Sequence, residues 1–230
     1  MRRCYIFRSG AILISTLILT LCIAAGVVAQ DSDPKFVSAP EFILSADAVA
    51  AGIDGVFKVT LSVDDAGTVK NVRLYGDPMW PCGASPNREL GAVRTAVEAH
   101  LRLIKFSPSM KNGKPRSSDV ILDFAIGEAF KRAKAAEEAK TGPSPKLVKG
   151  GVMNGRATQL VKPRAPKAQG NATVQVLIDE QGSVSKAGVL TGNALLFRSS
   201  REAACESKFS PTVIGGKAVQ VTGVITYFYH

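Results

Sequence analysis

The residue types that most often carry chemistry are sparse in this sequence. Only two histidines occur among its 230 residues, His100 and His230, and there are four cysteines. A histidine base or a metal-binding pair would require these two histidines to meet, and neither has Cys or acidic residues at ligand spacing. Cys82 stands between Pro81 and Gly83 without the Cys-x-x-Cys partner of a redox thiol. We expect His100 to be a solvated helix residue and His230 a frayed terminal residue.

Two pairs of acidic residues are the remaining candidates for catalysis. Asp64-Asp65 and Asp179-Glu180 each stand in a turn that ends in Gly, where Asp serves the turn itself. The sequence contains no Gly-rich phosphate loop between a strand and a helix, and no Gly-x-Ser-x-Gly. We therefore expect no catalytic site, no metal and no cofactor. An enzyme that uses Cys82 or His100 is the less favoured alternative.

The N-terminus has the three parts of a secretory signal. Residues 1–10 carry three arginines and no acid, residues 11–28 carry no charge, and Ala29 follows Val27-Val28. We favour cleavage after Ala29, while an uncleaved membrane anchor is the alternative, since about 18 apolar residues is the lower limit for spanning a bilayer. In both cases the protein lies outside the cytoplasm, either in the periplasm or on the inner membrane with a single N-terminal anchor.

The charge of the chain does not indicate nucleic-acid binding. Loss of the N-terminal segment would remove three basic and no acidic residues from a formal net charge of +10, leaving about +7. This charge is spread along the chain and is not interleaved with aromatic residues, of which only one is Trp. A solvated basic surface is therefore the favoured interpretation, and we expect no nucleic-acid partner.

One pattern of alternating residues occurs twice. Residues 57–63 and 173–178 alternate apolar and polar side chains, and each run ends in an acidic turn, Asp64-Asp65-Ala66-Gly67 or Asp179-Glu180-Gln181-Gly182. Such a run predicts a half-buried strand that enters a tight hairpin. The elements that follow in each unit are a second strand, a helix that stops at Phe-Ser-Pro, and a last strand. Their residue ranges are 68–75, 89–102 and 118–126 in the first unit and 183–190, 193–208 and 218–229 in the second.

This order predicts an α+β fold of two small modules, each a three-stranded antiparallel sheet with a helix packed on one face. We expect the modules at residues 40–127 and 148–230, joined by a charged helix and hinge at 128–147. Residues 77–88 have no counterpart in the second unit. Their Pro, Gly, Ser and Asn content predicts a surface loop, in which Trp80 serves either binding or as a lid over the sheet edge.

Cys82 and Cys205 would remain after cleavage and have two possible states. A disulfide is one, since the compartment is oxidising, but it would have to bridge the two modules. A small buried thiol is the other, because Cys205 shares the expected core face of a helix with Phe209. We favour the buried thiol.

Several spaced motifs of the second unit resemble a known family. They are Gly150-Gly151-Val152-Met153-Asn154-Gly155, Lys162-Pro163-Arg164-Ala165-Pro166, Val174-Gln175-Val176-Leu177-Ile178-Asp179 with Gly182, Lys208-Phe209-Ser210-Pro211-Thr212, and Val221-Thr222-Gly223-Val224-Ile225-Thr226-Tyr227. Together they are similar to the C-terminal domain of the TonB family of energy transducers over residues 148–230. Residues 55–127 resemble the same domain more faintly, as a diverged second copy.

The resemblance implies a binding protein that docks a partner by adding a strand to the edge of residues 218–229. The partner-binding residues would then be Val219, Val221, Gly223, Ile225 and Tyr227. The implied partner is an outer-membrane transporter or another envelope protein, with an inner-membrane motor complex added if the chain is anchored. The oligomeric state is not implied.

The sequence departs from the family pattern in three ways, of which the first two argue against energy transduction and the third against transporter binding in the usual manner. The apolar segment at 11–28 has no His, the 12 prolines form no spacer, and Ala165 and Lys162 replace the Tyr and Gln of the usual entry motif. The alternative function is a structural or peptidoglycan-binding envelope protein, which the basic charge of the chain supports.

Overall fold

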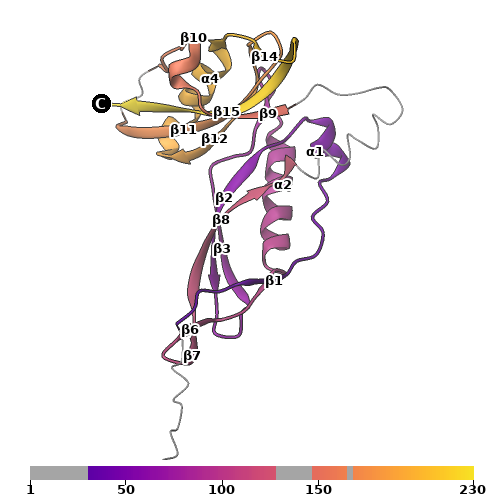
Figure 1. Cartoon of the computed structure of the whole chain (residues 1–230), viewed down its shortest axis with the longest axis vertical. Coiled ribbons are helices and arrows are strands. Elements are labelled where there is room, and N and C mark those ends of the chain that lie inside the picture. The colour runs from indigo at the N-terminus through magenta and orange to yellow at the C-terminus, as the bar shows by residue number, and fades with distance from the viewer. Residues whose placement is uncertain (1–30, 128–146, 165–167) are drawn as a thin grey trace, which may run out of the picture.

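The computed structural model describes residues 31–127, 147–164 and 168–230, which form two α+β modules (Figure 1). The N-terminal segment that we expect to be a signal or an anchor, and nearly all of the expected linker helix, lie outside these residues. The α+β prediction is confirmed, because each module is a mainly antiparallel sheet with one long helix on its face. The C-terminal sheet is larger than the three strands that we expected.

The N-terminal module is a three-stranded sheet in the order β3-β2-β8, covered by one helix. Its elements are β2 (Val56–Val63), β3 (Val69–Tyr75), α2 (Asn87–Leu101) and β8 (Ser118–Ala125). The strand period of two buries every second residue of β2, from Phe57 to Val63, to 1% exposure or less. These side chains pack in one cluster with Val93, Val97 and Leu101 of α2. The expected packing of the first unit is therefore present.

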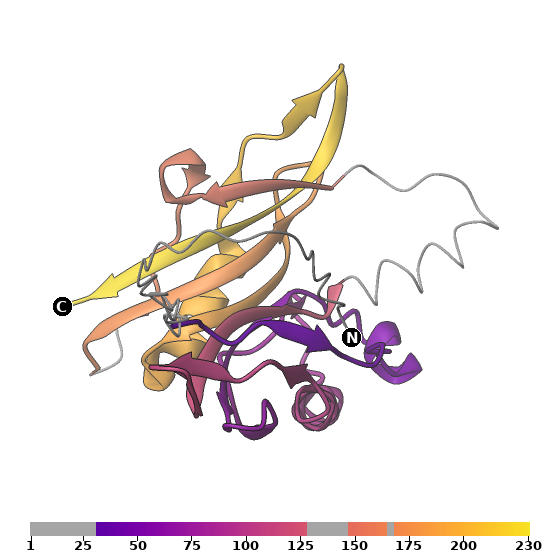
Figure 2. The same ribbon diagram turned by 60° about the horizontal axis from the view of Figure 1, so that its bottom comes forward.

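The C-terminal module has the central strand order β15-β11-β12 and the helix α4. Its main elements are β11 (Gly170–Ile178), β12 (Val184–Gly192), a 3-10 turn η2 (Ala194–Leu196), α4 (Phe197–Glu206) and β15 (Lys217–Tyr229). Val174, Leu196 and Ile225 are fully buried in its core. Three further strands extend the sheet, namely β14 (Thr212–Ile214), β9 (Leu147–Val152) and β4 (Trp80–Pro81). Figure 2 shows β14 and the start of β15 projecting beyond the sheet, with β9 beside β15.

Short elements brace both modules in similar ways. In the N-terminal module β1 (Phe36–Ser38) pairs with β5 (Lys105–Phe106), β6 (Ser109–Lys111) pairs with β7 (Lys114–Arg116), and α1 (Ala46–Ala50) contacts α2. In the C-terminal module β10 (Ala157–Gln159) pairs with β13 (Lys208–Phe209) after the 3-10 turn η1 (Asn154–Arg156). Both α2 and α4 are thus followed by a short strand that ties the chain back to its own module.

The two acidic turns have nearly the same hydrogen bonds. The Asp64 Oδ1 atom accepts from the Thr68 N–H at 2.8 Å, and the Asp179 Oδ1 atom accepts from the Ser183 N–H at 2.7 Å. The Thr68 bond is the main reason why the pKa of Asp64 lies below its ordinary value. These carboxylates therefore serve the turns, as the sequence predicts.

Each turn also binds the segment that leaves the helix. The carbonyl of Gly67 accepts from the Phe106 N–H at 2.9 Å, and that of Gly182 accepts from the Phe209 N–H at 2.8 Å. Both glycines have a positive φ, 78° and 82°. A Cβ atom on either would lie 1.9 Å from the carbonyl oxygen of the facing Phe. Only Gly lets the Phe-Ser-Pro segment approach the turn this closely.

We predict that Gly182→Ala lowers the free energy of unfolding by at least about 2 kcal/mol more than Gly215→Ala. Both positions have a positive φ, but nothing lies within 4 Å of a Cβ on Gly215. The pair therefore separates the clash with Phe209 from the cost of the left-handed backbone, which is about 1–2 kcal/mol for both. Chemical denaturation measures the difference, and equal losses in the two variants would show that the contact with Phe209 is unimportant.

Candidate docking surface

The five residues expected to bind a partner lie on β15 and face the core. Val219, Val221, Ile225 and Tyr227 are 5% exposed or less. Gly223 lies against the strand-to-turn segment that follows β9, where a Cβ would come 2.4 Å from the Met153 Cγ atom. These side chains hold β15 on the sheet. Any contact with an added strand would therefore use the backbone of the residues between them.

The backbone direction on β15 follows from the hydrogen bonds of Thr226. Its N–H donates to the Asn154 Oδ1 atom at 2.9 Å, and its carbonyl accepts from the Asn154 Nδ2 atom at 2.7 Å. Backbone groups alternate in direction along an antiparallel strand. The even-numbered residues of β15 therefore point away from β11, and the odd-numbered residues bond to it.

The outer edge of β15, which we expected to be open, is largely occupied by the chain itself. Strand β9 pairs with it in parallel from Gln220 to Val224, and the Val224 carbonyl accepts from the Met153 N–H at 2.8 Å. The Asn154 side chain then closes the edge at Thr226 in place of a strand. Phe228 is the next residue with an outward backbone, and its side chain is 67% exposed. The expectation of a wholly open edge is therefore wrong, and the open part begins beyond Thr226.

The opposite edge of this sheet, β12, is covered by the N-terminal module. Trp80 and Pro81 of β4 pair with Ala187 and Lys186. The Asp77 N–H donates to the Val189 carbonyl at 2.6 Å, and the Cys82 N–H donates to the Ser185 carbonyl at 2.9 Å. The prediction of a surface loop at 77–88 is wrong for residues 77–82, which pair with β12, and for Asn87 and Arg88, which begin α2. The backbone of Trp80 covers the edge of β12. This arrangement resembles the alternative in which Trp80 serves as a lid over the sheet edge.

A disulfide and an arginine fasten this strand. Cys82 and Cys205 are bonded with their Cα atoms 5.7 Å apart, so the buried thiol that we favoured for Cys205 is wrong. Arg201 of α4 donates to the carbonyls of Ala187, Trp80 and Pro81 at 3.0–3.2 Å. Its guanidinium carbon lies 3.9 Å from the centre of the Trp80 ring. Burial lowers the pKa of Arg201 to about 10, so it stays charged at neutral pH.

A buried glutamine adds a second connection between the modules. Gln175, on β11, is 5% exposed. Its Oε1 atom accepts from the Val56 N–H at 3.1 Å, while its Nε2 atom donates to the carbonyls of Val56 and Asp77 at 2.9 Å and 3.0 Å. An amide satisfies both the donor and the acceptors, whereas a carboxylate at this position would face two carbonyls without a proton to share. The amide of Gln175 therefore matches the backbone of the N-terminal module. We define the pairing of residues 77–82 with β12, together with Arg201 and Gln175, as the intermodule joint.

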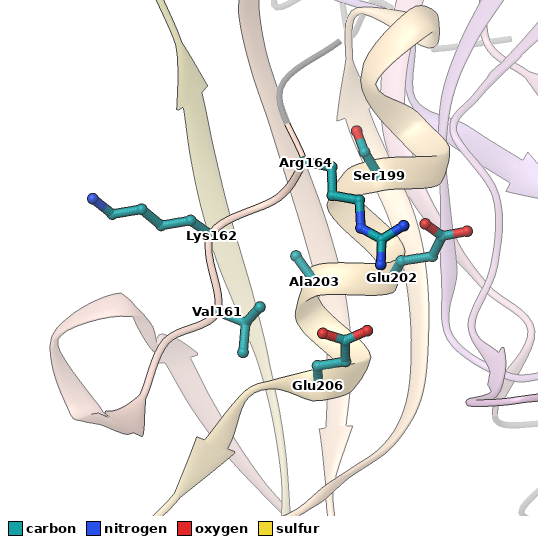
Figure 3. Close-up of a pocket in the computed structure, with 7 residues that line it drawn as sticks. All are labelled: Val161, Lys162, Arg164, Ser199, Glu202, Ala203 and Glu206. Carbon is teal, nitrogen blue, oxygen red and sulfur yellow. The ribbon is translucent and has the colours of Figure 1, made fainter.

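A cavity of about 250 Å³ lies between residues 161–164 and α4 (Figure 3). Arg164 reaches toward α4, where Glu202 and Glu206 lie, while the Lys162 side chain points away. Its lining residues are Val161, Lys162, Arg164, Ser199, Glu202, Ala203 and Glu206. This mixture of opposite charges favours neither an anion nor a cation, so we assign no ligand to it.

His100 lies among aromatic side chains. His100 packs between the rings of Phe42 and Phe124, at centroid distances of 5.1 Å and 5.5 Å, and is only partly exposed. The expectation of a fully solvated helix residue is therefore wrong. Across residues 31–127, 147–164 and 168–230, no three His, Cys, Asp or Glu side chains are placed to hold a metal ion. Within the same residues no helix is both long and apolar enough to cross a membrane.

Comparison with known proteins identifies the C-terminal module. Residues 163–230, which hold β11, β12, α4 and β15, match the family described as Gram-negative bacterial TonB protein C-terminal. This part of the chain is a TonB C-terminal domain, a non-catalytic domain of bacterial envelope proteins related to transport. The match does not extend into the N-terminal module. Neither a curated protein nor a solved structure matches the chain.

We predict that the free energy of unfolding of Cys82→Ser/Cys205→Ser is about 2–5 kcal/mol lower than that of the oxidised protein. The reason is that the disulfide closes a long loop in the unfolded chain. The two cysteines are 123 positions apart. Trp80 is the only tryptophan, so its fluorescence reports on the intermodule joint during denaturation. Reduced wild-type protein is the matched control and is expected to behave as the double variant does. Equal stability of the oxidised and reduced forms would contradict the assignment.

We predict that His100 makes stability fall with acidification. Burial lowers the pKa of His100 below its ordinary value of 6.5, so the folded protein favours the neutral ring. The stability that neutral His100 contributes is fully present above the pKa of His100 in the unfolded chain. It is lost as the pH falls through the pKa of His100 in the folded protein. The free energy of unfolding should therefore drop more for wild type than for His100→Gln between about pH 7 and pH 5. Identical pH profiles of the two proteins would refute a role for His100.

Proposed function

We propose that this protein is a TonB-type binding protein of the bacterial envelope that docks a partner by strand addition at the edge of β15. The proposed partner is an outer-membrane transporter or another envelope protein, met in the periplasm. The observation that carries the proposal is the family match at 163–230, because the matched region includes the whole of β15. The open end of that strand, at Phe228, supplies a place where pairing can begin.

The geometry of β9 supports exchange with a partner strand. Lys149, Gly151 and Val152 of β9 are exposed, and the pairing register shifts next to Gly151, which has a φ of 68°. These residues of β9 therefore contribute backbone pairing and little buried side-chain area. A partner strand that brings its own side chains would replace that pairing at small cost.

The N-terminal module supports a wider proposal, that it is a diverged copy of the same domain. Both modules have the same order of main elements and the same Asp-to-Gly turn, and both place a Phe-Ser-Pro segment on that turn. In this arrangement β8 occupies the position in its sheet that β15 occupies in the other. The chain would then consist of two related binding modules, exported by a signal peptide or held by an N-terminal anchor. Energy coupling is not part of the proposal, since the His and the Pro-rich spacer of full transducers are missing from the sequence.

Three single variants test docking at β15. Phe228→Pro removes an outward N–H without removing a bond to β11, and we predict about fivefold weaker binding, the effect of one backbone hydrogen bond. Phe228→Ala keeps that N–H and separates the backbone from the ring. Asn154→Ala releases the outward backbone groups of Thr226 and should tighten binding.

Binding is measured by titration with labelled peptides from the N-terminal segments of outer-membrane transporters. Full binding by Phe228→Pro, together with no gain for Asn154→Ala, would refute strand addition at this edge. Salt-sensitive cosedimentation with purified cell wall, without any transporter binding, would instead favour the peptidoglycan-binding alternative.

A further inference from the structure

The described part of the chain covers much of three of the four edges of the two main sheets. Strand β4 covers β12, and β9 with Asn154 covers most of β15. The edge of β3 is capped by two arginines of the α2 region. Arg102 donates to the Lys70 carbonyl at 3.2 Å, and Arg94 donates to the carbonyls of Leu74 and Gly76. Each of these contacts leaves fewer backbone groups with which another chain could pair.

The remaining edge belongs to β8, which pairs with β2 on one side only. The Ile126 N–H donates to the Gly55 carbonyl at 2.9 Å, so the even-numbered residues at this end of the strand face β2. The backbone groups of Asp119, Ile121 and Asp123 therefore point outward. Among residues 31–127, 147–164 and 168–230, no strand pairs with them. Within the described residues, the outward N–H and C=O groups of this eight-residue strand therefore have no partner strand.

The side chains beside this edge have a distinct chemistry. Ile121 is 77% exposed, and Asp119 and Asp123 lie two positions before and after it on the same face. Asp123 also forms an ion pair with Lys58 of β2 at 2.6 Å, where both side chains remain partly exposed. An acidic strip of this kind contrasts with the formal net charge of +10 of the whole chain.

We propose that the edge of β8 is a second docking site, which binds an extended segment of a partner protein carrying a basic residue on either side of an apolar one. Backbone pairing would supply the affinity, and the two aspartates would select the flanking basic residues. The apolar residue of the partner would lie against Ile121. This inference concerns the N-terminal module and does not depend on docking at β15.

A second copy of this chain is a poor occupant for the same edge. Antiparallel pairing of two β8 strands about Ile121 would set Asp119 of one copy opposite Asp123 of the other, twice in each dimer. Like charges directly opposite each other destabilise a strand pair. The charges of β8 therefore favour a basic partner over self-association.

The test titrates the oxidised full-length chain with the peptide Thr-Lys-Thr-Val-Thr-Lys-Thr, capped at both ends, and follows backbone amide shifts by NMR. Its matched control is Thr-Glu-Thr-Val-Thr-Glu-Thr. We expect the lysine peptide to shift the amides of Asp119, Ile121 and Asp123 at up to about 5 mM, and the glutamate peptide to leave them unchanged. No shift of these amides, or equal shifts with both peptides, would overturn the proposal.

Two variants of β8 and one of β15 complete the test. Ile121→Pro removes an outward N–H and is expected to bind the lysine peptide about fivefold more weakly or worse. Asp119→Lys/Asp123→Lys keeps every backbone group. This variant should bind the glutamate peptide more tightly than the lysine peptide. Phe228→Pro should bind the lysine peptide as wild type does, so that failure at β15 is distinguished from failure at β8. A dimer that dissociates on Ile121→Pro would overturn the proposal in favour of self-association.

Discussion

The edge of β12 carries backbone N–H and C=O groups that need partners, and residues 77–82 of the other module supply them. Without this pairing, the C-terminal sheet would end in an open strand beside a hydrophobic core. The Cys82–Cys205 disulfide holds residues 77–82 covalently on this edge. Arg201 donates hydrogen bonds to the Trp80 and Pro81 carbonyls of β4. Gln175 extends the same matching of donors and acceptors to the start of β2. The two modules are thus joined by hydrogen bonds that each needs for its own completion.

This joint decides which surfaces remain for binding. Because β12 pairs with β4, the β15 edge is the one left to the C-terminal domain among the described residues. Strand β9 limits the available part of that edge to its last residues, unless a partner strand replaces β9. In the N-terminal module the arginines of the α2 region cap β3, which leaves β8. Among the described residues, the outward backbone groups available for strand pairing therefore lie on the last strand of each module, with the intermodule joint between the two modules. Such an arrangement suits a protein that holds two extended segments at once.

The sequence predicted the elements that have strong local signals. The alternation of 57–63 and 173–178, the Asp-to-Gly turns and the Phe-Ser-Pro stops identify the main strands and helices to within a few residues. The joint was missed because β4 has two residues, one of them Pro, and shows no periodicity. The disulfide was missed for the same reason, since only the pairing of β4 with β12 brings Cys82 to α4. The occupied edge of β15 could not be foreseen from Leu147–Val152, because an added strand held by its backbone has no required side-chain pattern.

Residue-resolved amide hydrogen exchange of the oxidised chain tests this account most directly. The account predicts slow exchange for Cys82 and for the central strands β2 and β11, whose amides are bonded on both sides of the sheet. It predicts fast exchange for Asp119, Ile121, Asp123 and Phe228, whose N–H groups point outward without a partner strand. Fast exchange at Cys82 would show that the joint is open, and protection of the three β8 amides in the free protein would show that this edge is already closed.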